Sequence, residues 1–102
     1  MLLWMSGLLT IGDEAFSSCS SLQNVEIPST VTSLGNNVFQ NSGVKNITFK
    51  STTPATITET SLKDMWSLQK IIVPDEAVDT YKAAENWSTY AAKIVGESEV
   101  EG

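Results

Sequence analysis

A set of apolar residues recurs at a nearly constant interval through this sequence and limits the folds open to it. Three apolar positions recur together, and they are occupied by Ile11, Leu34 and Ile57, by Phe16, Phe39 and Leu62, and by Leu22, Val44 and Leu68. The residue number rises by 23 at each step in the first two sets, and by 22 and then 24 in the third. Such a period is typical of repeat folds, in which each unit buries the apolar residues of its neighbours. We therefore expect stacked copies of one small unit.

Each copy also contains two apolar residues separated by a single position. These pairs are Val25/Ile27, Ile47/Phe49 and Ile71/Val73. Residues two apart lie on the same face of a strand, so each copy should contain one short strand that is buried on one side. Stacked copies bring these strands side by side in parallel. The sequence predicts an α/β repeat solenoid with one short parallel strand per repeat and about three repeats.

The period divides the chain into one domain, residues 1–95, and an acidic tail, residues 96–102. Within the domain we expect repeats at 10–31, 32–54 and 55–74, and a helical cap at 75–95.

Residues 1–9 are interpreted as a truncated preceding repeat, and a disordered leader or a cloning remnant is the alternative. An interval of 23 places Leu2 beside Val25, Trp4 beside Ile27 and Leu8 beside Val31. The open edge of this strand would allow self-association.

The segment after Pro74 changes from strand to helical spacing. Its apolar residues are Val78, Tyr81, Ala84, Trp87, Tyr90, Ala91 and Ile94. Asp75 directly follows the proline and is predicted to be the N-cap. Asn86 is expected to separate two short helices, and Trp87 to lie in the core of the cap. The acidic tail from Gly96 onward is expected to fray.

The family resemblance rests on three stretches, IGDEAFSSCSSLQNVEIPSTVTSLGNNVFQNSGVKNITF, KSTTPATI and LQKIIVPDEAVDTYKAAENWSTYAAKI. They resemble the BspA-like leucine-rich-repeat family, and the last two resemble the final repeat and capping helix of Bacteroides members. The resemblance implies a right-handed superhelix, a cell-surface or secreted location, and host matrix or cell-surface proteins as partners. It also implies that Cys19 is a small, buried turn residue.

Composition excludes several classes of function. The net charge is -6 and all six basic residues are lysines, which argues against nucleic acid and against a polybasic membrane contact. The apolar start, MLLWMSGLLT, has about half of the ~20 residues that span a bilayer, so we expect no membrane insertion.

The sequence also lacks the usual groups for catalysis. It has no histidine, which removes the common Ser/His and Cys/His arrangements. Asp13 and Glu14 are expected to form a solvated turn. No calcium-loop or dinucleotide motif is present, so we predict no enzyme activity, no metal and no cofactor.

The remaining candidate site is the outward face of the strands. If the apolar pairs point inward, the alternating residues point outward, together with Pro28 and Pro74. The candidate binding residues are Asn24, Glu26, Asn46, Thr48, Lys50, Lys70 and Ile72. We predict a non-enzymatic module that binds a protein through this face.

Three alternatives remain open: a solvated face with no partner, a structural spacer or terminal cap of a larger surface protein, and a carbohydrate-binding module that uses Trp66.

Overall fold

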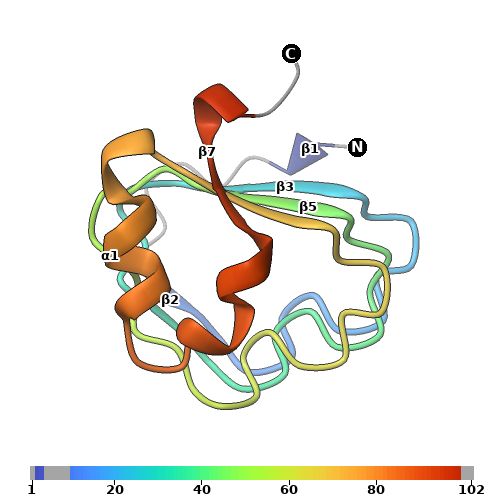
Figure 1. Cartoon of the computed structure of the whole chain (residues 1–102). Coiled ribbons are helices and arrows are strands. Elements are labelled where there is room, and N and C mark those ends of the chain that lie inside the picture. The colour runs from blue at the N-terminus through green and yellow to red at the C-terminus, as the bar shows by residue number, and fades with distance from the viewer. Residues whose placement is uncertain (1, 4–9, 100–102) are drawn as a thin grey trace.

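The computed structural model describes residues 2–3 and 10–99. The strands are β1 (Leu2–Leu3), β2 (Thr10–Ile11), β3 (Asn24–Ile27), β4 (Ser33–Leu34), β5 (Asn46–Phe49), β6 (Lys70–Val73) and β7 (Ile94–Gly96). The helical segments are η1 (Asp75–Ala77), α1 (Val78–Ala83), η2 (Ser88–Lys93) and η3 (Glu97–Glu99), of which only α1 is an α-helix. Figure 1 shows the successive coils of the chain lying beside one another.

Within the described residues, five parallel strands form the main sheet in the order β1-β3-β5-β6-β7. Asn24 pairs with Asn46, and Asn46 pairs with Lys70, so the strand register follows the repeat interval of the sequence. Figure 1 shows β3 and β5 side by side along one side of the molecule. The parallel strands and the scarcity of helices fit the repeat fold that the period predicts.

The three four-residue strands of this sheet bury every second residue. The buried residues are Val25, Ile27, Ile47, Phe49, Ile71 and Val73, each at most 2% exposed. Full burial of one such side chain contributes roughly 1.5–3 kcal/mol, so six of them form a large part of the stabilising core. The alternation predicted for the inner face is confirmed.

Away from the main sheet, shorter contacts join the same coils. Strands β2 and β4 pair in parallel, and Ser33 of β4 forms a parallel bridge with Thr56. In the turns that follow, a left-handed residue recurs at the same place in each copy, with φ of 61°, 58° and 60° at Ser18, Asn41 and Asp64. Small polar side chains tolerate this conformation better than β-branched ones. The repeat is therefore built from turn chemistry as well as from apolar spacing.

The recurring set Phe16, Phe39 and Leu62 should form one column in the interior of stacked copies, and its first two members are a stacked pair of rings. Phe16 and Phe39 have ring centroids 5.5 Å apart and planes inclined by only 11°. Phe39 and Leu62 are fully buried in the core cluster, and Phe16 is half-buried against it. The three residues thus share one interior, as the repeat interval predicts.

The C-terminal segment is less helical than its apolar spacing predicts. Asn86 does separate two short elements, since it has a φ of 67° between α1 and η2. Ile94, however, belongs to strand β7, which pairs in parallel with β6. The prediction of helix as far as Ile94 is wrong. Over a few residues the same apolar spacing fits a helix or a strand, and here main-chain pairing with the exposed edge of β6 favours the strand.

Two further predictions about this segment are wrong. Pro74, not Asp75, occupies the N-cap position of η1, and Asp75 forms no capping hydrogen bond there. Asp75 Oδ1 instead accepts a hydrogen bond from the Ser98 backbone N–H at 2.9 Å. Gly96 donates its N–H to Glu99 Oε1 at 3.0 Å. The described start of the acidic tail is therefore held by hydrogen bonds and is not frayed.

The register predicted for the N-terminal strand is also wrong by one position. Leu2 pairs with Asn24, and Leu3 pairs with Val25. The interval from β1 to β3 therefore equals the interval from β3 to β5, which is shorter than the interval that the prediction assumed. The prediction failed because the length of the turns varies between copies. The predictions for Trp4 and Leu8 lie outside the described residues.

Candidate functional site

The outward residues of β3, β5 and β6 form two rows across the main sheet. The strand register places Asn24, Asn46 and Lys70 side by side in the first row. It places Glu26, Thr48 and Ile72 side by side in the second row. We call these residues, together with Lys50, the strand face.

Accessibility differs within the strand face. Asn24, Lys50 and Lys70 are exposed, whereas Glu26, Asn46, Thr48 and Ile72 are half-buried. Neighbouring strands lie about 4.8 Å apart in any sheet, so the side chains of the adjacent strands flank the half-buried residues. A partner that covered the face would meet a packed, mixed surface.

Two polar contacts order the strand face. Asn46 donates from Nδ2 to Asn24 Oδ1 at 3.1 Å, which joins β3 and β5 through their side chains. Lys50 Nζ lies 3.9 Å from Glu97 Oε1, at the beginning of η3. This ion pair is about half exposed, so it contributes little to stability. The ion pair does place the carboxylate of Glu97 beside Lys50, at an end of the strand face where the sequence analysis expected only the lysine.

Strand β7 adds to the strand face a residue that the sequence analysis missed. Val95 is the register partner of Ile72 and is likewise half-buried. The second row therefore changes along the sheet from charged Glu26, through Thr48, to this apolar pair. The sequence carries no alternation that marks this strand, because Ile94 and Val95 are both apolar and directly follow a segment with helical spacing, and the alternating burial of β7 appears only in the structure.

The prolines that follow β3 and β6 were both predicted to point outward, and only Pro74 differs. Pro28 is half-buried, like Glu26 and Thr48, whereas Pro74 is buried. Pro74 is buried because it leads into η1, which packs against β7. At the Pro74 position the strand face is therefore closed to a partner.

Trp66 lies in a turn away from these rows. It is 76% exposed, and its indole Nε1 donates to Asn41 Oδ1 at 2.9 Å. An exposed ring is what the carbohydrate-binding alternative requires. The hydrogen bond fixes the ring against the turn of the preceding copy.

Trp87 has the opposite environment and is 1% exposed, as predicted for a core residue. Its ring meets the rings of Phe49 and Tyr81 edge-on, at centroid distances of 4.8 and 4.9 Å. Tyr81 donates its hydroxyl to the Ser51 carbonyl at 2.6 Å, and burial raises its pKa to about 12. Burial and the charge of Asp64 also raise the pKa of Tyr90. Neither tyrosine ionises at neutral pH.

Of the candidate chemical groups Asp13, Glu14 and Cys19, Asp13 has a structural role. Asp13 Oδ1 accepts a hydrogen bond from the Asn36 backbone N–H at 2.8 Å, and Glu14 is exposed. Cys19 is a free thiol that packs half-buried against the core, so it is less buried than the family resemblance implies. In the part of the chain that the structure describes, no three His, Cys, Asp or Glu residues lie close enough together to hold a metal ion.

A family model described as "BspA type Leucine rich repeat region (6 copies)" matches residues 3–94. The chain belongs to the BspA-type leucine-rich-repeat family. This match confirms the family resemblance seen in the sequence. No curated protein matches this leucine-rich-repeat chain. Leucine-rich repeats commonly mediate protein interactions through extended surfaces and are generally not enzymes. Their BspA-type members are typically surface or secreted proteins.

None of the helices described in this leucine-rich-repeat chain is long and apolar enough to cross a bilayer.

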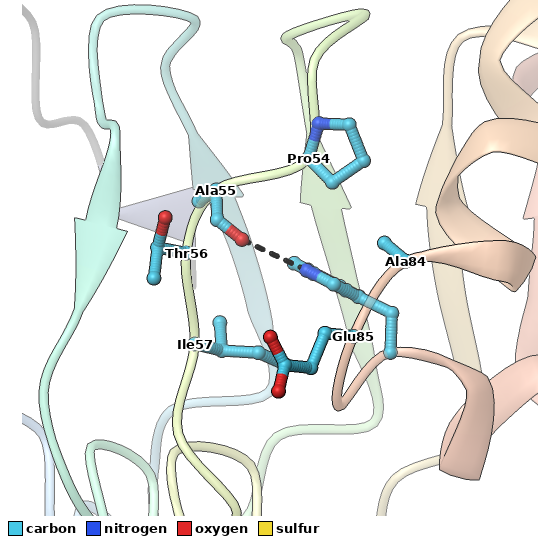
Figure 2. Close-up of a pocket in the computed structure, with 7 residues that line it drawn as sticks. Pro54, Ala55, Thr56, Ile57, Ala84 and Glu85 are labelled. Atoms are coloured by element: carbon cyan, nitrogen blue, oxygen red, sulfur yellow. Dashed lines mark hydrogen bonds between the residues drawn. The ribbon is translucent and has the colours of Figure 1, made fainter.

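A pocket of about 210 Å³ lies apart from the strand face of this leucine-rich-repeat chain. It separates the segment at 54–57 from the turn between α1 and η2, as Figure 2 shows. Trp87 donates from Nε1 to the Ala55 carbonyl at 2.8 Å, and Asn86 donates from Nδ2 to the Ile57 carbonyl at 2.8 Å. These two bonds hold the walls of the pocket together.

Proposed function

We propose that this chain is a non-enzymatic protein-binding and adhesion module of a bacterial cell-surface or secreted protein. The contact surface is the strand face, at Asn24, Glu26, Asn46, Thr48, Lys50, Lys70 and Ile72. The partner is a host matrix or cell-surface protein. The observation that carries the proposal is the register that aligns these residues in two rows across three neighbouring strands.

The chemistry of the rows supports a protein partner. A row that passes from Glu26 through Thr48 to Ile72 and Val95 offers a charge, a hydroxyl and an apolar patch at fixed spacing. Protein interfaces combine apolar contacts with a polar rim, and this row supplies both, with its apolar pair toward the edge strand β7. Lys50 and Lys70 lie at opposite ends of their strands and would form part of that rim.

We further propose that the repeats form a right-handed solenoid whose C-terminal end is capped by residues 75–95, within one domain that spans 1–95. The bonds around Thr56 support this. Its backbone N–H donates to Thr32, and its carbonyl accepts from Leu34, so one side of the segment is joined to the preceding copy. On the other side, side chains of Trp87 and Asn86 donate to the carbonyls of Ala55 and Ile57. Side chains there replace the backbone of a next repeat.

The same observation favours a second function, as a spacer or terminal cap of a larger surface protein whose binding lies elsewhere. In that case the outer edge of β1 is where an earlier repeat, or a second copy, would pair. A third candidate is carbohydrate binding through Trp66. It is supported by the exposed ring that Asn41 holds in one orientation, since fixed aromatic faces are suited to stacking.

The first experiment measures binding of the purified protein to plates coated with extracellular-matrix extract and to intact host cells. The test variant carries Glu26→Ala, Thr48→Ala and Ile72→Ala together. The matched control carries alanine at Glu59, Thr52 and Trp66, three exposed residues outside the strand face. We expect at least tenfold weaker binding for the test variant and unchanged binding for the control.

Loss of binding in the control but not in the test variant would favour Trp66 and contradict the strand face. Equal binding by all three proteins would leave the spacer as the better proposal. Circular dichroism melting curves check that each variant folds, because Thr48 and Ile72 are half-buried and their truncation lowers stability slightly.

A further inference from the structure

The pocket between residues 54–57 and the α1–η2 turn has a chemical character that the strand face lacks. Its lining residues are Pro54, Ala55, Thr56, Ile57, Ala84, Glu85 and Trp87. Five of these seven are apolar, and the only charged one is Glu85. Figure 2 shows Glu85 extending from the turn toward Ile57, so its carboxylate borders a pocket with a mixed lining. Its accessible apolar walls are Pro54 and Ala84, because Ala55, Ile57 and Trp87 are at most 6% exposed.

Two side-chain hydrogen-bond donors beside the pocket are already engaged. The indole N–H of Trp87 is bonded to Ala55, and the side-chain amide of Asn86 is bonded to Ile57. Glu85 is exposed, and it takes part in none of the ion pairs found among residues 10–99. The pocket therefore presents a negative charge and no free charged donor to an incoming group.

The size of the pocket selects a single side chain. Its 210 Å³ exceeds a cavity of about 150 Å³ that takes up benzene, and it is below the ~300–1,000 Å³ of sites for drug-sized ligands. A sugar is a poor fit, because Trp87 is 1% exposed and offers no open ring face. A slender apolar stem that ends in a positive charge matches both the walls and the carboxylate.

We propose that this pocket binds a lysine side chain of a partner protein, with the four-carbon stem against the half-buried residues Pro54 and Ala84 and the ammonium group at Glu85. Lysine is proposed over arginine on size, since a compact ammonium needs less room than a planar guanidinium in a pocket of about 210 Å³. The net charge of -6 favours a basic partner over an acidic one.

This inference goes beyond the strand-face proposal and does not depend on it. The wall at 54–57 belongs to the side of the molecule where Thr56 bridges to β4, and no residue of the strand face lines the pocket. A partner could therefore contact either surface alone.

The test uses the whole chain labelled with ¹³C at its alanine methyl groups, and Nα-acetyl-lysine methylamide as the probe. Ala55 and Ala84 line the pocket, whereas exposed Ala15 and buried Ala77 lie outside it and act as internal references. We expect the probe, titrated at constant ionic strength, to shift the methyl signals of Ala55 and Ala84 saturably and to leave both references unmoved.

Charge and shape are tested separately. Glu85→Gln should weaken the probe about three- to fivefold, which is the scale of a solvent-exposed ion pair. Glu76→Gln, at an exposed glutamate outside the pocket, should leave binding unchanged. Ala84→Leu should fill the pocket and abolish the shifts. The Nε-acetylated probe, which keeps the stem but loses the charge, should bind as weakly to the wild type as the lysine probe binds to Glu85→Gln.

Three results would overturn the inference. The first is the absence of a saturable shift at Ala55 and Ala84. The second is equal binding of the charged and the acetylated probe. The third is a shift of the same two signals when the protein alone is concentrated, because the occupant would then be a second copy of this chain. Retention of probe binding by the strand-face variant would show that the two proposals fail or succeed independently.

Discussion

Replacing Trp87 with phenylalanine tests how strongly the C-terminal segment is fastened to the repeats. Its indole N–H donates to the buried Ala55 carbonyl at 2.8 Å. Phenylalanine removes this donor and leaves the carbonyl without its partner, which costs about 1–3 kcal/mol. The smaller ring also leaves a void beside Phe49 and Tyr81. Complete truncation of a buried tryptophan costs about 3–5 kcal/mol, so a partial void should cost about 1–2 kcal/mol.

The combined loss is about 3 kcal/mol, a large fraction of the ~5–15 kcal/mol by which domains are stable. Urea unfolding followed by circular dichroism measures it, and an unchanged slope with urea shows that the unfolded state is the same. Trp66→Phe is the matched control, since Trp66 is 76% exposed and its replacement should cost less than about 0.5 kcal/mol. The reasoning is refuted if Trp87→Phe costs under about 1 kcal/mol or no more than the control.

Two further changes test the turns and the buried phenol. A Cβ on Gly35 would overlap Asp13 Oδ1 and lie 2.7 Å from the Asp13 backbone nitrogen, whereas a Cβ on Gly12 would meet nothing within 4 Å. Gly35→Ala should therefore lower the free energy of unfolding by about 1–3 kcal/mol and Gly12→Ala by less than about 0.5 kcal/mol, and equal urea midpoints would contradict this. Tyr81 has a folded pKa of about 12 and a usual value of 10.0, so between pH 10 and 12 the unfolded state loses the phenol proton first and stability falls. This contribution is on the order of 1–2 kcal/mol, and the stability difference between wild type and Tyr81→Phe should shrink over that pH range; a constant difference would exclude it.

The inner face of the main sheet could be predicted residue by residue. The pairs Val25/Ile27, Ile47/Phe49 and Ile71/Val73 are all buried, as their alternating spacing indicated. This worked because an apolar residue at every second position marks a strand face whichever neighbours the strand acquires. The two rows of the strand face follow from the same alternation, and the register brings them together.

The C-terminal segment shows where sequence reasoning failed. Val78 and Tyr81 do lie in or against the core, but Ile94 continues the sheet instead of the helix. Over such a short stretch, helix and strand spacings overlap, so the choice depended on the free edge of β6. Likewise, Asp75 follows a proline as an N-cap would, yet its carboxylate accepts from Ser98, which is distant in the chain.

The pocket could not have been predicted at all. Its two walls come from segments far apart in the chain, and the period that includes Ile57 in one wall gives no sign that Ala84, Glu85 and Trp87 form the other. It exists because Trp87 and Asn86 donate hydrogen bonds across that separation and hold the α1–η2 turn beside residues 54–57.

The sequence by itself determined the repeat, the positions of β3, β5 and β6 and the apolar residues that these strands bury, because an apolar period is a property of the chain before it folds. Only the tertiary structure decided the register of β1, the addition of β7 and Val95, the burial of Pro74 and the pocket at Glu85. Each of these arises from bonds between residues far apart in the chain, whose free energy depends on geometry that no local pattern records.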